Sequence, residues 1–267
     1  YTPNIQDVVT GTQSNFETSG GFGPNQVSTI LGLGIFIFFV QLMLNSSNGI
    51  LQIINGGLVL FFAYRGLITF SRGGIYTGVA MILLLLAILY FQANFQTKPK
   101  IAGIIVLSFL ATLAVWSYSS IKTNGLLDKR YANQDAAGRE KKSQLSGREI
   151  LIESELKMFY ENPILGVGVG KNKELRKSQT GIDLATHNEI TRMLAEHGTL
   201  GIVGLLILVI TPLYLFLVDR QNILALSFFV FWLLTINHAA MRLSAPAFIY
   251  ALSLLKVYRE APVVHRK

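Results

Sequence analysis

The sequence predicts an all-α integral membrane protein, in which a bundle of transmembrane helices carries one large polar loop. Hydrophobic residues make up 51% of the chain and charged residues only 14%, whereas a soluble domain carries about a quarter charged residues. The charge is also uneven, because 13 of the 23 basic and 11 of the 15 acidic residues lie between positions 119 and 198. The rest of the chain is nearly free of charge, as segments in contact with lipid must be.

Apolar runs mark the expected helices. A bilayer-spanning helix needs roughly 20 mostly apolar residues; six segments approach that length, and a seventh is shorter. They are residues 27–44, 49–70, 74–91, 101–118, 200–218, 223–239 and, for the short one, 245–258. The sequence lacks the alternation typical of barrel strands, so the membrane part is predicted to be helical.

Basic residues in the short loops predict the orientation, because Lys and Arg there mark the cytoplasmic side. Lys98, Lys100 and Arg220 then lie inside, and the long loop lies outside together with Arg72. Because the chain begins at Tyr1 rather than Met, we expect it to be the C-terminal portion of a longer membrane protein. The expected organisation is an outer segment at 1–26, four spans in 27–118, a loop with two helices in 119–198, two or three spans in 199–258 and a basic cytoplasmic tail at 259–267.

Composition excludes several classes of function. The chain has no cysteine, which rules out thiol catalysis, disulfides and cysteine-ligated metals, and its dispersed histidines do not form a metal site. Basic residues that flank membrane spans and face lipid phosphates explain the net charge of +8 better than nucleic acid does. We therefore expect membrane lipids as partners, and no nucleic acid, metal or cofactor.

Two capping boxes, in which Ser or Thr is followed three residues later by Glu, predict two helices in the long loop. Ser146 with Glu149 opens the first, and Thr186 with Glu189 opens the second, which runs to Gly198. Between the helices, glycines alternate with valines over residues 166–170. This spacing is not that of a nucleotide-binding loop, and it indicates a close backbone approach or a hinge.

His187 is the sharpest candidate for chemistry in the loop. If Thr186 is the N-cap, His187 is the first helical residue, where the positive end of the helix dipole keeps its imidazole neutral and available as a base. The free amides of the same terminus suit a phosphate group, and Asn188 and Glu189 are further candidates from the same turn. The alternative is an ordinary polar residue in a helix cap.

Arginines form the second group of candidates. Arg72, at the outer end of a span, could hold a diphosphate together with Arg148, Arg192 and Arg242, because a guanidinium binds phosphate oxygens in bidentate fashion. Arg65 lies inside a predicted span, seven residues before Arg72. If the helix runs that far, the two arginines lie on roughly the same face. An ionisable residue there usually faces the protein interior. The alternative is that these arginines extend to lipid headgroups at the membrane boundary.

The motifs around these residues resemble the signature of the O-antigen ligase and O-antigen polymerase superfamily. The resemblance rests on Glu-Asn-Pro-Ile-Leu-Gly-Val-Gly at 161–168, Thr-His-Asn-Glu at 186–189 and Leu-Ala-Glu-His-Gly-Thr-Leu-Gly at 194–201, with Gly-Phe-Gly-Pro-Asn at 21–25, Ser-Arg-Gly at 71–73 and Ser-Gly-Arg at 146–148. The order of spans, one large loop and further spans is similar too, although the family's N-terminal helices are absent here.

The resemblance implies a GT-C type glycosyltransferase of the bacterial inner membrane that works on the periplasmic face. Such an enzyme passes a glycan from an undecaprenyl diphosphate carrier to an acceptor hydroxyl, without a cofactor or metal. His187 matches the family's essential loop histidine, which is proposed to activate the acceptor. Arg72 and Arg148 fall in motifs whose arginines bind the diphosphate, and Arg65 is added as a donor-binding candidate. Arg192 and Arg242 match less closely.

The acceptor remains open among related activities. We expect lipid A-core, the acceptor of an O-antigen ligase, while a polysaccharide polymerase and a protein O-oligosaccharyltransferase would use the same donor. In a different class, a transporter or channel would line an anion path with Arg65 and the outer arginines, and a non-catalytic envelope scaffold would use His187 only as a helix cap. Transporters commonly show internal repeats, which this sequence lacks, so glycan transfer is the function predicted.

Overall fold

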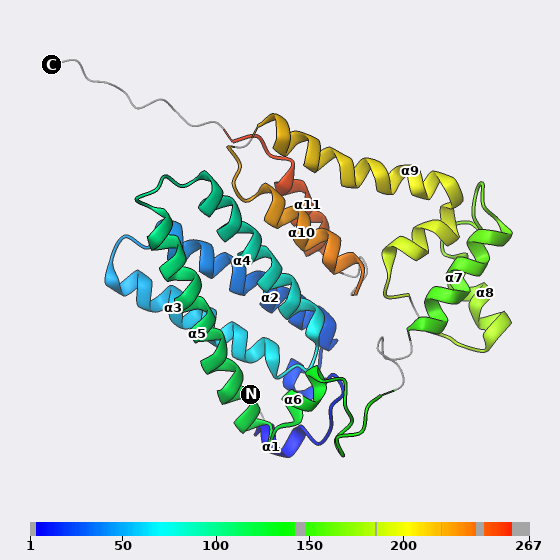
Figure 1. The fold of residues 1–267 in the computed structure, drawn as a ribbon. Coiled ribbons are helices and arrows are strands. Elements are labelled where there is room, and N and C mark those ends of the chain that lie inside the picture. The colour runs from blue at the N-terminus through cyan, green and yellow to red at the C-terminus, as the bar shows by residue number, and fades with distance from the viewer. Residues whose placement is uncertain (1–3, 142–147, 185, 220, 239–242, 258–267) are drawn as a thin grey trace.

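The structure is a computed structural model that describes residues 4–141, 148–184, 186–219, 221–238 and 243–257. Within these ranges the chain forms helices and no strands, apart from one isolated bridge (Figure 1). Five helices are long and apolar enough to cross a membrane. The all-α membrane fold that the sequence predicts is therefore confirmed.

The first four of these long helices lie at or close to the spans predicted from the apolar runs. They follow a short helix α1 (Ile5–Val8) and a 3-10 turn η1 (Glu17–Ser19). The long helices are α2 (Pro24–Val40, extended by the π-turn η2, Gln41–Asn45), α3 (Gly49–Leu67), α4 (Arg72–Gln92) and α5 (Lys98–Lys122).

Small residues allow α2 and α4 to lie very close together. A Cβ atom placed on Gly32 would meet the carbonyl oxygen of Gly74 at 2.1 Å, and one placed on Gly74 would meet that of Ser28 at 2.0 Å. A larger side chain at either glycine would force the helices apart, which is why small residues are common between membrane helices.

Two shorter helices, α10 (Ala225–Ile236) and α11 (Ser244–Ser253), pack against each other, and α10 also packs against α4. They coincide with parts of the last two predicted spans, 223–239 and 245–258. α10 has 12 residues and α11 has 10, which amounts to about 18 and 15 Å of helix, whereas the hydrocarbon core is about 30 Å thick. Within the described residues, neither helix is long enough to cross a bilayer alone.

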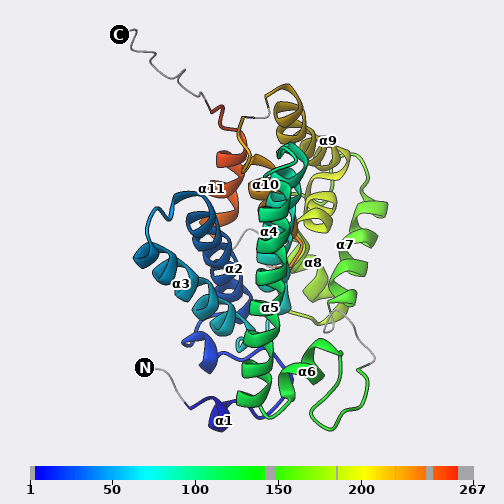
Figure 2. The same cartoon turned by 60° about the vertical axis from the view of Figure 1, so that its left-hand side comes forward.

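The long loop holds more helix than the sequence predicts. Three short helices, α6 (Leu126–Tyr131), α7 (Glu149–Glu161) and α8 (Lys171–Thr180), precede the 30-residue α9 (Glu189–Val218). α6 packs on the end of α5, whereas α7, α8 and α9 pack on one another. We call α7, α8 and residues 189–197 of α9 the cap, which lies beside the α2–α5 bundle (Figures 1 and 2). Helices α6 and α8 were not predicted.

α9 is interrupted at Gly198, whose φ of 58° and ψ of −138° are not helical. The predicted end of the loop helix at Gly198 thus coincides with a kink, and the predicted span 200–218 is the second part of the same helix. The backbone of the glycine-rich loop lies against this kink. A Cβ atom on Gly166 would come within 2.4 Å of the Glu196 backbone, so the close approach predicted from the alternating glycines is confirmed at Gly166.

Candidate functional site

The connection between α3 and α4, residues 68–71, is buried and determines where Arg72, the first residue of α4, is placed. Each of its four carbonyl oxygens accepts a hydrogen bond, as buried backbone groups must. The donors are Thr18 Oγ1 to Ile68 at 2.7 Å, Asn15 N to Thr69 at 3.0 Å, Arg130 Nε to Phe70 at 2.9 Å and Ser28 Oγ to Ser71 at 2.8 Å. The N-terminal segment, α2 and α6 therefore hold this connection together.

Phe70 in this connection has a φ of 57°, a left-handed conformation that is unfavourable for a bulky residue. Its side chain is fully buried and packs in a cluster with Ile68 and Leu127, so packing maintains the strained backbone. Such strain persists where the surrounding structure over-determines it, and it collects at functional sites. The direction in which α4 starts, and with it the position of Arg72, is therefore rigidly set.

Arg130 on α6 lies next to this connection and is only 8% exposed. Its Nε donates to the Phe70 carbonyl, and its Nη2 lies 3.5 Å from Ser14 Oγ. Burial lowers the pKa of the Arg130 guanidinium, and the like charges of Arg72 and Arg148 lower it further. Contacts place the three arginines near one another: Arg130 bonds to Phe70, two residues before Arg72, and Arg148 bonds to His238, whose ring lies against Gly73. We call Arg72, Arg130 and Arg148 the arginine cluster.

A hydroxyl and a fourth cation lie beside the arginine cluster. Burial raises the pKa of the Tyr131 hydroxyl, and the charges of Arg72 and Arg130 partly oppose that shift. The hydroxyl is buried and has no hydrogen-bond partner among the described residues. Burial also lowers the pKa of Lys141, and the positive charges of Arg130 and Arg72 lower it further. An oxygen-rich anion bound here would accept a hydrogen bond from this hydroxyl.

Arg148 directly precedes α7, which begins at Glu149. The helix predicted at this point is present, and the Ser146 of the predicted capping box lies outside the described residues. Arg148 Nη1 donates to the carbonyl oxygen of His238 at 3.4 Å. This contact joins the start of the cap to the end of α10.

His187 lies before α9, not in its first turn as predicted. The helix begins at Glu189, and its N-cap is Asn188 rather than Thr186. The Asn188 side-chain oxygen accepts hydrogen bonds from the second and third amides of the helix, at 2.9 and 3.3 Å. Since Asn188 occupies these amides, they are not available to a phosphate group, and the predicted anion site at this terminus is corrected.

Arg65 and Arg192, predicted as donor-binding and supporting residues, are held by other partners. Arg65 Nη2 donates to a backbone carbonyl of the N-terminal segment at 3.3 Å. Arg192 forms ion pairs with Glu189 and Glu196 of its own helix, the second at 3.2 Å. Of the described charges, neither is among those that shift the pKa of Arg130. The last arginine candidate, Arg242, lies outside the described residues.

The part of the chain that contains most of these residues matches a known protein family. Residues 57–209, from within α3 to within α9, match the family described as O-antigen ligase. This match covers more than half of the chain. The chain belongs to the O-antigen ligase family. No curated protein and no solved structure matches it.

As a member of the O-antigen ligase family, the chain is a membrane glycosyltransferase of the ligase or polymerase type, a class that uses a lipid-linked glycan donor and an acceptor. The match contains the arginine cluster and His187. It excludes α2 and the N-terminal segment, which nevertheless hold the connection before Arg72 through Thr18 and Ser28.

The candidate site residues lie in two parts of the molecule. The arginine cluster lies at α6 and at the starts of α4 and α7, whereas His187 lies in the turn between α8 and α9. Helix α7 connects the two parts, because it begins next to Arg148 and packs against α8 and α9. Among the described residues, no three His, Asp or Glu side chains gather where they could hold a metal ion.

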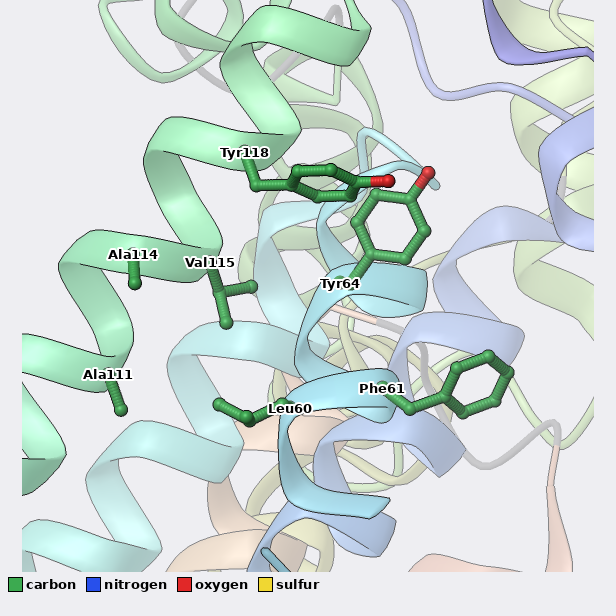
Figure 3. Close-up of a pocket in the computed structure, with 7 residues that line it drawn as sticks. All are labelled: Leu60, Phe61, Tyr64, Ala111, Ala114, Val115 and Tyr118. Atoms are coloured by element: carbon green, nitrogen blue, oxygen red, sulfur yellow. The ribbon is translucent and has the colours of Figure 1, made fainter. Parts of the chain in front are cut away.

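A groove between α3 and α5 lies apart from these residues (Figure 3). It has a volume of about 440 Å³ and a nearly apolar lining, in which the Tyr64 and Tyr118 rings lie 5.2 Å apart. Because both helices are candidate spans, such a surface suits lipid hydrocarbon rather than a diphosphate. The other lining residues are Leu60, Phe61, Ala111, Ala114 and Val115.

Arg130 and Tyr131 are the site residues that sequence analysis missed. They fall in the short helix α6, where no motif marks them, and their importance comes from the docking of α6 against the connection before α4. The sequence feature that could have indicated them is the adjacent basic and aromatic pair, but such pairs are also common on protein surfaces.

Proposed function

We propose that this chain transfers a glycan from undecaprenyl diphosphate to an acceptor hydroxyl on the periplasmic face of the membrane, acting as an O-antigen ligase with lipid A-core as acceptor. The observation that carries the proposal is the arginine cluster, which lies inside the family match. A diphosphate concentrates negative charge on oxygens that guanidiniums bind with two parallel hydrogen bonds. The family supplies the class of donor, and the cluster supports the place where its charge is bound.

In this proposal Arg72, Arg130 and Arg148 bind the diphosphate, and the Tyr131 hydroxyl donates to one of its oxygens. The start of α9 is not part of the donor site, because Asn188 already occupies its amides. Arg192 is also outside it, since Glu189 and Glu196 pair with its charge. Arg65 donates to a backbone carbonyl, as Arg130 and Arg148 do, and stays a candidate.

His187 is proposed as the general base. The acceptor oxygen attacks the anomeric carbon and gives its proton to the imidazole, while the bond from that carbon to the diphosphate oxygen breaks. The bonding electrons leave with the diphosphate, whose charge the arginine cluster stabilises, so that no acid needs to protonate it. A single displacement of this kind inverts the configuration of the anomeric carbon.

A transfer assay on two histidine variants tests this role. Without its general base, the His187→Ala enzyme should lose about 10²–10⁴-fold in transfer rate, while it remains inserted and folded. His197→Ala is the matched control, because His197 is also in the cap and has no proposed role; it should keep its rate within about twofold. If His187→Ala transfers glycan at the rate of the unaltered protein, His187 is not the base.

The same assay separates the rival functions. A polymerase would extend a second lipid-linked glycan, and a protein O-oligosaccharyltransferase would modify a serine- or threonine-bearing protein in preference to lipid A-core. A transporter or a scaffold would bind the donor without consuming it. The product formed when all three acceptors are offered together identifies which activity the chain has.

A further inference from the structure

We propose that Glu155 is the positioning residue of the turn that carries His187. Its carboxylate, together with Arg176, fastens the chain on both sides of that histidine. The proposal deepens the proposed function and rests on the role given there to His187.

The carboxylate of Glu155 is shared by three helices of the cap. Arg176 Nη1 on α8 lies 3.1 Å from Glu155 Oε1, and neither side chain has any exposure to solvent. Asn172 Nδ2, also on α8, donates to the same oxygen at 3.2 Å. Thr191 Oγ1 on α9 donates to the other oxygen, Oε2, at 2.5 Å. Both carboxylate oxygens are therefore engaged, one by each neighbouring helix.

These bonds reach the chain before and after His187. Arg176 uses its Nη2 to donate to the carbonyl oxygen of Leu184, three residues before the histidine. Thr191 lies four residues after it, and its hydroxyl also lies 3.4 Å from the carbonyl oxygen of Asn188. The turn is thus tied at both ends to one buried ion pair.

The burial of this pair indicates a geometric role. An ion pair without solvent contact loses the hydration of both charges, and well-packed apolar residues of the same volume are often as stable or more so. What apolar residues lack is direction, because a carboxylate fixes its donors at hydrogen-bond distance and angle. The pair therefore contributes a defined placement of α8 and α9 on α7, rather than net stability.

Helix α7 extends this placement to the arginine cluster. Glu155 lies seven residues after Arg148, which is two helical turns and about 10 Å along the axis, on roughly the same face. One rigid helix then determines the separation between a donor-binding arginine and the base. Transfer by direct displacement depends on such a fixed separation, because small misplacements of reacting groups cost much of the rate.

Three variants of the full chain in membranes test the inference. We call Glu155 with its partners Asn172, Arg176 and Thr191 the clamp. Glu155→Gln removes the negative charge of the clamp, and Thr191→Val removes one hydroxyl with little change of shape. Glu161→Gln is the matched control, because Glu161 is on the same helix but is 51% exposed and only loosely paired with Lys157 at 3.8 Å. Transfer kinetics are measured together with amide hydrogen exchange in peptides that follow His187.

We expect both clamp variants to lower kcat at least tenfold while KM for donor and acceptor changes less than twofold. Exchange at residues 186–191 should become faster, whereas exchange in α2 stays unchanged. Glu161→Gln should match the unaltered protein in all of these measurements. If Glu155→Gln does not accumulate in the membrane, Thr191→Val decides, since it introduces no unpaired buried arginine.

The outcomes separate this inference from the proposed function. If His187→Ala is inactive but Thr191→Val and Glu155→Gln keep their kcat within twofold, the clamp is overturned and His187 remains the base. If His187→Ala is fully active, His187 is not the base of the proposed function. The test of the clamp then rests on hydrogen exchange alone. Unchanged exchange at 186–191 in both clamp variants then overturns it, and faster exchange supports it.

Discussion

Arg130 is a buried cation that lies near two like charges, those of Arg72 and Arg148. A buried guanidinium loses hydration, and Arg72 and Arg148 add repulsion, as the lowered pKa of Arg130 reflects. The hydrogen bond to the Phe70 carbonyl offsets part of that cost. A bound diphosphate would remove the repulsion, so we expect Arg130 to contribute to donor affinity as well as to the support of the connection before α4.

Exchanging arginine for lysine tests whether the cluster uses bidentate geometry. Lysine keeps the charge but cannot form the planar fork, and hydrogen bonds to charged groups contribute about 1.5–3 kcal/mol each. Arg72→Lys and Arg130→Lys should therefore raise the Kd for the lipid-diphosphate glycan about tenfold or more. The measurement is retention of labelled donor by purified protein in lipid nanodiscs.

Arg139→Lys serves as the control for these exchanges. Arg139 is on the same loop but is 81% exposed and paired with Asp135, so the exchange should leave donor affinity unchanged. Unaltered affinity in Arg72→Lys would instead make Arg72 an anchor to lipid headgroups.

At the level of helices, the contact between the kink in α9 and the glycine-rich loop connects the cap to a membrane span. Thr199 N donates to the Pro163 carbonyl at 2.8 Å, and Val167 N donates to the Ala195 carbonyl at 2.8 Å. The two backbones touch on both sides of Gly198. This contact leaves no room for a side chain at Gly198 in α9 or at Gly166 in the loop.

Gly198→Ala should therefore destabilise the cap. The new Cβ atom would lie 2.6 Å from two carbonyl oxygens in the loop. The backbone angles of Gly198, φ of 58° and ψ of −138°, are also ones that only glycine adopts readily. We expect a loss of about 1–3 kcal/mol in stability. Thermal unfolding in detergent should show a lower midpoint. Gly103→Ala is the control, because Gly103 lies in α5 with nothing near its Cβ position, and alanine favours helix. An unchanged midpoint in Gly198→Ala would mean that the kink can relax.

The start of α9 shows why a capping pattern alone misplaces a helix boundary. The run Thr-His-Asn-Glu allows either Thr186 or Asn188 as N-cap, since both residue types are good caps. The structure selects Asn188, whose side chain bonds two amides. Thr186 Oγ1 instead accepts from the Asn188 amide at 3.3 Å, so it stabilises the turn before the helix. This difference of two residues moves His187 out of the helix.

For the molecule as a whole, the antiparallel order of the long helices brings the proposed site residues to one end. α2 and α4 begin there and α3 and α5 end there, as the bonds of Ser28 to Ser71 and of Arg130 to Phe70 require, and the Arg148–His238 contact adds the end of α10. The loops at 46–48 and 93–97 lie at the opposite end (Figure 1). We expect the first end to face the periplasm.

Single cysteines test this orientation, because the chain has none of its own. A membrane-impermeant maleimide applied to intact cells with a permeable outer membrane should label Lys157→Cys on α7. Gln96→Cys, in the loop between α4 and α5, should react only after the inner membrane is opened. Labelling of Gln96→Cys alone in intact cells would place the cap in the cytoplasm and contradict transfer on the periplasmic side.

Features that depend on local composition could be predicted from the amino-acid sequence. A span is recognisable because lipid requires a continuous apolar run, so the positions of α2 to α5 and of the last part of α9 follow from hydropathy. Arg72, Arg148 and His187 were identified because each belongs to a motif of contiguous residues. The close approach at Gly166 was also predicted from its glycines, whereas Gly198 was predicted to end a helix and instead kinks α9.

Which side chains lie together depends on how distant segments of the chain pack. Arg130 joins Arg72 because α6 docks on a connection 60 residues earlier in the chain, and Glu155 meets Arg176 and Thr191 because three separate helices pack around one carboxylate. The same packing gave Arg192 its own acidic partners. Whether a charge is buried and whether it has an opposite charge nearby depend on contacts between distant segments. Local sequence does not predict those contacts.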